Sequence, residues 1–131
     1  MNAISSSLKD LIEQVNYLTE SALNGELTNR ADENKFQGSY KEIIHGMNAT
    51  LDVVIEPINE SRDILEKMAK GDLTVRMTGN YKGDFSIVKD SINSLGESFS
   101  EALSNVTDAI QATASASTQI SSSTEEMATG A

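Results

Sequence analysis

The sequence of 131 residues has no cysteine, no tryptophan and a single proline, and only 5% of its residues are aromatic. Without cysteine, the chain forms no disulfide and offers no thiolate as a nucleophile or metal ligand. No apolar run approaches the ~20 residues that a membrane-spanning helix requires. The first residues also lack the basic and apolar regions of a signal peptide. These absences predict a soluble, cytoplasmic piece of protein.

Positive charge is also scarce: 10 Lys and Arg stand against 20 Asp and Glu, for a net charge of −10. Such a chain repels phosphate backbones and anionic lipid surfaces, so we expect neither nucleic acid nor a membrane as a partner. No glycine-rich loop follows a strand pattern, no nucleophile–base set is visible, and the one histidine has no second histidine with which to bind a metal. We therefore expect no enzymatic activity, no metal and no cofactor.

What the chain does contain is an internal repeat with a period of about 45 residues. The segment 25–28 (GELT) matches 71–74 (GDLT), and Arg30 matches Arg76. Further along, Met47-Asn48 matches Ile92-Asn93. Each repeat reads as helix, connector, helix.

Apolar residues spaced three and four apart predict three helices. These run from Ile4 to Ala22, from Tyr40 to Met68 and from Phe85 to Met127. The spacing repeats every seven residues, which is typical of a left-handed coiled coil. Pro57 falls inside the second run, and because the heptad phase crosses it unbroken, we expect a kink there rather than a helix end.

The connectors, at about 25–39 and 71–84, are longer than an antiparallel helix pair needs, which is about 2–8 residues. About 14 extended residues can climb back along a helix, so the second helix of each repeat should run parallel to the first. In the second connector, Leu73, Val75 and Met77 should point to one side, while Thr74 and Arg76 face out. This alternation is also a strand signal, but no partner strand exists, and we favour an extended connector.

Two parallel helices joined in this way leave much of their apolar seams uncovered. The sequence therefore predicts an all-α fold in which a homodimer forms parallel four-helix coiled-coil bundles, followed by a C-terminal coiled-coil helix.

A helix, then G-x-L-x-x-x-apolar, then a second helix resembles the HAMP domain of bacterial and archaeal receptors, and the likeness extends over residues 8–104. The family's Asp-Glu-x-Gly signature is replaced here by Gly-Ser-Tyr and Gly-Asp-Phe. The resemblance implies two HAMP units in series, at 1–56 and 57–104, with Pro57 at their junction. It also implies a connector glycine and two packing positions in each unit, namely Gly25, Leu27 and Ala31, and Gly71, Leu73 and Met77.

The tail, 111–131, resembles the start of the signalling helix of methyl-accepting chemotaxis proteins, so that 105–131 begins such a helix. In that family, adaptation sites place a Glu pair between pairs of small residues, which implies possible methylation at Glu125 or Glu126. From the residues alone, a solvated acidic pair near a frayed helix end is the simpler interpretation, and by analogy with the family Glu126 is the better candidate of the two.

The resemblance implies an intramolecular signal relay in a chemoreceptor, from a sensory input to a coiled-coil output domain. Its expected partners are a second copy and, through a domain beyond Ala131, a chemotaxis histidine kinase and a coupling adaptor. Two alternatives remain open: a structural coiled-coil rod for dimerisation, and the same relay feeding a histidine kinase or cyclase. A rod needs heptads but not paired glycine-bounded connectors, and the Ser/Ala-rich tail favours a chemoreceptor.

Overall fold

The computed structural model describes residues 2–130, and these form three α-helices and one short 3₁₀ helix. The elements are α1 (Asn2–Leu23), η1 (Glu33–Lys35), α2 (Gly38–Ala69) and α3 (Asp84–Gly130). Within this described part of the chain there is no strand. The predicted all-α class and the three predicted helices are confirmed, as is the interpretation of residues 73–77 as a connector.

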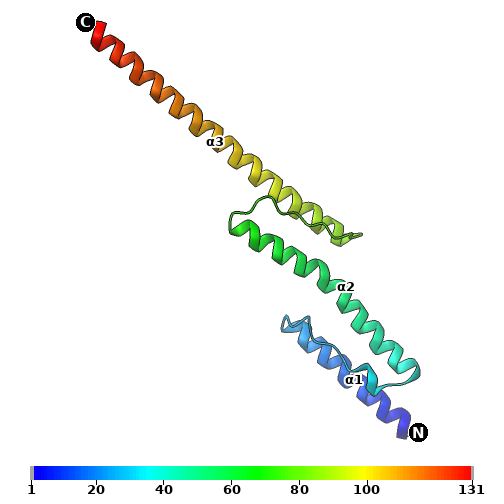
Figure 1. Cartoon of the computed structure of the whole chain (residues 1–131). Coiled ribbons are helices and arrows are strands. Elements are labelled where there is room, and N and C mark those ends of the chain that lie inside the picture. The colour runs from blue at the N-terminus through cyan, green and yellow to red at the C-terminus, as the bar shows by residue number, and fades with distance from the viewer. Residues whose placement is uncertain (1, 131) are drawn as a thin grey trace. The chain divides into compact units, whose positions relative to one another are not determined.

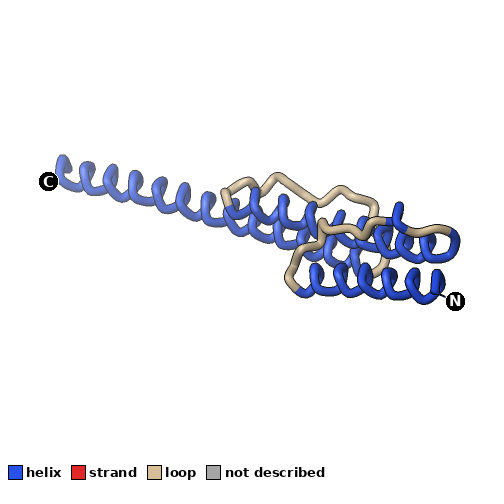
Figure 2. Tube along the Cα trace, turned by 90° about the horizontal axis from the view of Figure 1, so that it is seen from below, coloured by secondary structure: helices blue, strands red, loops and turns tan. Residues whose placement is uncertain are grey.

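The chain divides into two compact units, Met1–Arg62 and Asp63–Ala131, called the first and second unit below. In the first unit, α1 and the beginning of α2 run in the same direction, and the connector returns between their ends (Figure 1). In the second unit, the end of α2 and the beginning of α3 have the same arrangement. Figure 2 shows each connector as an extended loop beside its helices. Parallel helices are therefore found within both units.

Each connector starts at a helix end built around a glycine. Gly25 has a φ of 79°, and its N–H donates to the Ala22 carbonyl (3.0 Å), while the Glu26 N–H donates to the Ser21 carbonyl (2.8 Å). This is a Schellman motif, which requires a left-handed residue after the helix. Gly71, with a φ of 100°, and the residue after it make the same two bonds in the second unit. Both helices therefore end just before the residues at which the connectors were predicted to begin, 25 and 71.

The first connector contains a feature that the sequence pattern did not predict, the 3₁₀ turn η1. Its N-cap, Asp32, accepts a hydrogen bond from the Asn34 backbone N–H (3.1 Å). The turn is followed by Phe36, which is buried.

Each unit has its own hydrophobic core, and in each the connector contributes to it. The core of the first unit consists of Leu11, Leu18, Ala31, Phe36 and Ile44. The core of the second unit consists of Ile64, Met68, Met77 and Ile92. Ile44, with no exposed surface, and Met77, with 2% exposed, are the most deeply buried large side chains of the described residues.

Pro57 lies inside α2, and the helix continues through it to Ala69, as predicted. The Ser61 hydroxyl donates to the Pro57 carbonyl (2.6 Å). One uninterrupted helix thus supplies the second helix of the first unit and the first helix of the second.

Candidate functional site

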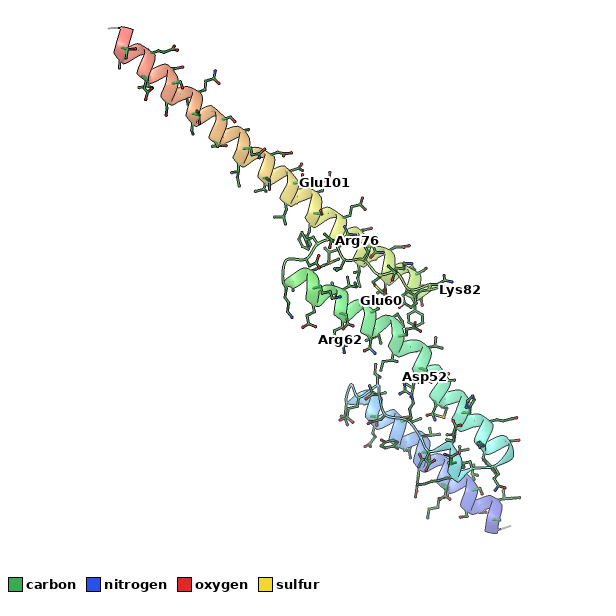
Figure 3. All side chains as sticks on the ribbon, viewed as in Figure 1. Asp52, Glu60, Arg62, Arg76, Lys82 and Glu101 are labelled. Atoms are coloured by element: carbon green, nitrogen blue, oxygen red, sulfur yellow. The ribbon has the colours of Figure 1, made fainter. Side chains whose placement is uncertain are left out.

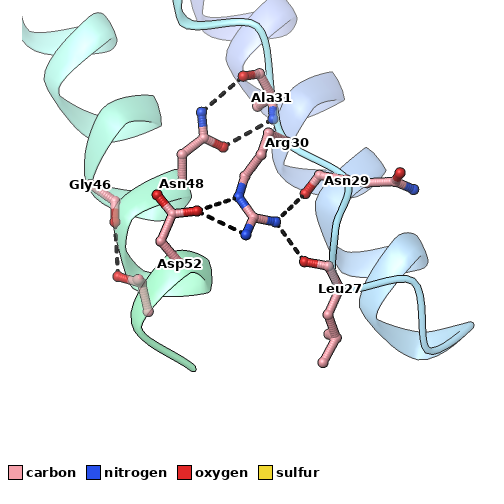
Figure 4. Close-up of polar contacts among 8 residues, drawn as sticks. Leu27, Asn29, Arg30, Ala31, Gly46, Asn48 and Asp52 are labelled. Atoms are coloured by element: carbon pink, nitrogen blue, oxygen red, sulfur yellow. Dashed lines mark hydrogen bonds and ion pairs between the residues drawn. The ribbon is translucent and has the colours of Figure 1, made fainter. Parts of the chain in front are cut away.

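The two connectors are held to their helices by the same polar clamp. In the first unit, the Asn48 side chain on α2 accepts a hydrogen bond from the Ala31 N–H (3.0 Å) and donates to the Ala31 carbonyl (2.9 Å), as Figure 4 shows. In the second unit, Asn93 on α3 accepts from the Met77 N–H (2.7 Å) and donates to the Met77 carbonyl (3.1 Å). In each unit, one side-chain amide therefore bonds both the backbone N–H and the carbonyl of a buried connector residue, groups that need hydrogen-bond partners away from water.

An arginine folds back onto each connector next to the clamp. Arg30 Nη1 donates to the carbonyls of Leu27 and Asn29. Arg76 Nη1 makes the matching bonds to the carbonyls of Leu73 and Val75. Each guanidinium ties its connector into a compact turn. The prediction that Arg76 faces outward is wrong: its side chain is half-buried and folds back over its own backbone.

Arg30 and Arg76 differ in the contact that each makes with the neighbouring helix. Arg30 forms an ion pair with Asp52 of α2 (2.9 Å), which Figure 4 shows beside the clamp. The Arg30 side chain is 25% exposed and that of Asp52 is 68% exposed, so the pair stabilises the fold by about 1 kcal/mol or less. Its role is to fix the position of the connector. Arg76, labelled in Figure 3 on the second connector, instead lies against Gly96 of α3.

The packing positions suggested by the family resemblance lie on the connectors with different degrees of burial. Ala31 (5% exposed) and Met77 (2%) belong to the two cores. Leu27 and Leu73 are half-buried. Gly25 and Gly71 are the left-handed residues of the helix ends. Their roles as a functional set stay predictions.

A groove opens in each unit next to the half-buried connector leucine. In the second unit it is almost wholly apolar, and it is lined by Leu65, Met68, Leu73, Leu95, Phe99 and Leu103. In the first unit the corresponding surface is more polar, with Leu27, Ile55 and Ile58 beside Asn59 and Arg62. In both units, therefore, the apolar seam that the heptads predict is open on one side.

Beyond Gly96, every described residue of α3 is exposed. Its large apolar side chains are more than half exposed, and they are Phe99, Leu103, Val106, Ile110, Ile120 and Met127. At 1.5 Å per residue, the 47-residue helix is about 70 Å long. Glu125 and Glu126 lie on this exposed part, and the methylation hypothesis stays a prediction.

Sequence reasoning missed the roles of Asn48, Asn93 and Asp52. The repeat contains a signal that identifies the two asparagines, since Asn48 matches Asn93 just as Arg30 matches Arg76. Polar residues that coincide in two repeats, on helices that otherwise coincide in apolar positions, indicate a shared polar contact.

A metal site and a membrane-spanning helix are two features that would bear on function. Among residues 2–130, no cluster of three or more His, Asp or Glu side chains has the arrangement of a metal site. None of the helices in that range combines the length and the apolar character needed to span a membrane.

We expect Asn93→Ala to release the second connector. The substitution removes the two hydrogen bonds that Asn93 makes to the backbone of Met77, and an intramolecular hydrogen bond stabilises the fold by about 0.5–1.5 kcal/mol. The Met77 amide should then exchange with solvent far faster in hydrogen-exchange NMR. Ser94→Ala, at the exposed neighbouring position, is the matched control and should leave the exchange unchanged. Unaltered protection of Met77 in Asn93→Ala would show that the clamp does not hold the connector.

Asp72 shapes the turn at the start of the second connector. The Thr74 hydroxyl (2.5 Å) and the Thr74 backbone N–H (3.1 Å) both donate to Asp72 Oδ1. These bonds favour the carboxylate and lower the pKa of Asp72 from its usual value of 3.8.

This turn should therefore open in acid. Because the folded-state pKa is lowered, the contribution of Asp72 is fully present above its unfolded-state pKa of about 3.9. It is lost as the pH falls through the lower, folded-state pKa. An NMR titration of the Thr74 amide should give a midpoint below 3.8 in the natural protein and no transition in Asp72→Asn. A midpoint at or above that value would contradict the bonded turn.

The comparisons with known proteins come from sequence. A family model described as the HAMP domain matches residues 35–101, about half of the chain. The match includes all of α2, the whole second connector and Asn93. The methyl-accepting chemotaxis protein McpB of Pseudomonas aeruginosa is 27% identical to the chain over 97 residues. That alignment covers 74% of this chain and 14% of the relative, so the chain spans about a seventh of the relative's length. No solved structure gives a significant match.

Proposed function

The chain belongs to the HAMP domain family, and from that premise we propose that it relays a conformational signal within a chemoreceptor. The input is a change imposed on α1 by a sensory region, and the output is a change in the coiled coil that α3 begins. The named relative, a methyl-accepting chemotaxis protein, supports this setting. In this proposal residues 1–56 and 57–104 act as two relay units in series, and 105–131 begins the output helix.

The observation that carries the proposal is the uncovered apolar seam. Leu95, Phe99 and Val106 repeat at heptad spacing, and each is more than 40% exposed in the single chain. A seam of this kind is stable in water only when another helix covers it. The occupant we propose is a second copy of this chain, because the same stripe on an identical, parallel helix is complementary to itself. Each unit then becomes a parallel four-helix bundle.

Such a bundle can relay a signal because its helices have more than one way to pack. A rotation, a tilt or a change in dynamics of α1 alters the first bundle, and α2 carries the change into the second. The clamps of Asn48 and Asn93 keep the connectors attached while the helices move. For a signal to switch the output, the two packings must differ by only a few kcal/mol.

The chemotaxis partners of the proposal lie beyond the residues seen here. A domain after Ala131 would bind a histidine kinase and a coupling adaptor, and Glu125 or Glu126 would be methylated during adaptation. The paired clamps support a relay over a structural rod, because a rod of uniform heptads has no need for connectors that are bound in the same way twice.

Single cysteines test the dimer. The chain has no cysteine of its own, so each variant carries one thiol. In a parallel dimer, the thiols of Val106→Cys face each other, and so do those of Ile120→Cys, because both positions lie on the seam. We expect rapid oxidation of both to a disulfide-linked dimer. Ser104→Cys, on the opposite side of α3, is the control and should oxidise slowly.

The two seam positions also distinguish the orientations. They lie 14 residues apart, about 21 Å along the helix, so antiparallel copies cannot bring both residues onto their own counterparts. Without oxidant, the mass in solution at micromolar concentration should be about twice 14.1 kDa. A folded monomer, or a cross-link at only one of the two positions, would exclude the parallel bundle.

A further inference from the structure

Gly96 lies buried in α3, at the point in the second unit where α2, the connector and α3 meet. A Cβ atom at this position would lie 2.5 Å from Met68 Cε, 2.7 Å from Arg76 Nη1 and 3.1 Å from Arg76 Cζ. Carbon atoms do not approach so closely without something moving. Position 96 therefore has no room for a side chain while both neighbours stay where they are.

Met68 and Arg76, the two neighbours of position 96, each make contacts that hold the second unit together. Met68 belongs to the core of the second unit. Arg76 uses the same Nη1 atom to bond the carbonyls of Leu73 and Val75, which folds the connector into its turn. The atoms nearest to position 96 are the ends of long, flexible side chains, not backbone. A side chain at 96 is thus accommodated only by shifting the ends of the Arg76 and Met68 side chains, and the end of Arg76 that shifts is the one that bonds the two carbonyls.

In the first unit, the connector is positioned against its helix by different contacts. In the register set by Asn48 and Asn93, Gly96 corresponds to Leu51, which packs partly buried against the core. Arg30, the counterpart of Arg76, extends to Asp52, with Nε and Nη2 each 2.9 Å from Oδ1. One connector is therefore positioned by a charge pair at the surface, and the other by a close contact with bare backbone.

A second glycine shows that this contact is specific to position 96. Gly46 lies within α2, and a Cβ there would meet nothing within 4 Å. Alanine is a better helix former than glycine in a helix interior. The glycine at 96 is therefore unfavourable to α3 on its own, and the close approach of Arg76 and Met68 gives the physical reason for it.

We propose that Gly96 is the seat of a latch that holds the second connector against α3. Arg76 and Met68 converge on this seat, and the size of the residue at position 96 sets whether the connector is docked or released. The latch acts on the second unit alone, so it allows that unit to be loosened without changing the first. The docking of the second connector on α3 is inferred from the contacts of Arg76 and Met68 alone. Any effect on receptor output rests on the relay proposed above.

The test compares Gly96→Ala with Gly46→Ala in the full chain. Both variants gain helix propensity, but only the first forces Arg76 and Met68 to move. We expect Gly46→Ala to melt higher than the natural protein, with connector exchange unchanged. Gly96→Ala should melt no higher, and the amides of residues 73–77 should exchange about tenfold faster, the size expected for losing one or two intramolecular hydrogen bonds.

A third variant separates the latch from a general loss of packing. Arg76→Ala removes the side chain that contacts position 96. Adding Gly96→Ala to it should therefore produce little further increase in the amide exchange of residues 73–77. Equal melting gains for Gly46→Ala and Gly96→Ala, with the connector still protected, would overturn the proposal. So would full additivity of Gly96→Ala and Arg76→Ala. These outcomes concern amide exchange and melting temperature only. The relay proposal is tested separately, by the cross-linking of the dimer and by the output of the receptor.

Discussion

Replacing Met77 with alanine should lower the free energy of unfolding of the second unit by about 2–5 kcal/mol, the usual range for a buried methionine truncated in a core. The side chain is 2% exposed and packs with Ile64, Met68 and Ile92. Those residues come from both helices of the unit, so the loss affects the contact between α2 and α3 as well as the connector. Such a loss is large against the total stability of a small domain.

The control for this prediction is on the same connector. Asn80→Ala changes an exposed side chain and should alter the free energy of unfolding by about 0.5 kcal/mol or less. Leu73→Ala should fall between the two, because Leu73 is half-buried and lines the open groove. Chemical denaturation of the three variants gives the order directly. If Met77→Ala and Asn80→Ala unfolded at the same denaturant concentration, Met77 would not be the anchor of the connector.

The helices and their ends were predictable because their causes are local. A heptad of apolar residues and a glycine after the last turn act within a few positions of the chain, and they placed α1, α2 and α3 to within three residues at the helix ends. The extended form of the second connector followed in the same way, from the lack of a strand partner for residues 73–77.

The contacts that hold the connectors were not predictable in this way. The Asn93 clamp joins atoms 16 residues apart, and it exists only because the connector passes α3 at hydrogen-bonding distance. No local propensity specifies that distance. Arg76 was expected to face outward from alternation alone, but the side chain is long enough to fold back onto carbonyls of its own segment. The contact at Gly96 depends on three segments at once, and the repeat offers no counterpart, since Leu51 stands there in the first unit.

The proposed relay requires that the two units are coupled through one helix in a fixed phase. α2 runs unbroken from Gly38 to Ala69 with Pro57 inside it. Proline removes one backbone hydrogen bond, so the joint can bend while the helix continues. In that case the rotational phase of the second unit is set by the number of residues between the units.

The most direct measurement is the output of a full-length receptor with residues inserted after Pro57. One inserted residue turns the seam of the second unit by about 100° relative to the first, whereas seven inserted residues nearly restore the phase. If the relay depends on this phase, the single insertion abolishes or inverts the response to the stimulus, and the seven-residue insertion leaves it largely intact. Normal responses from both insertions, in receptors that are expressed and dimeric, would contradict the relay.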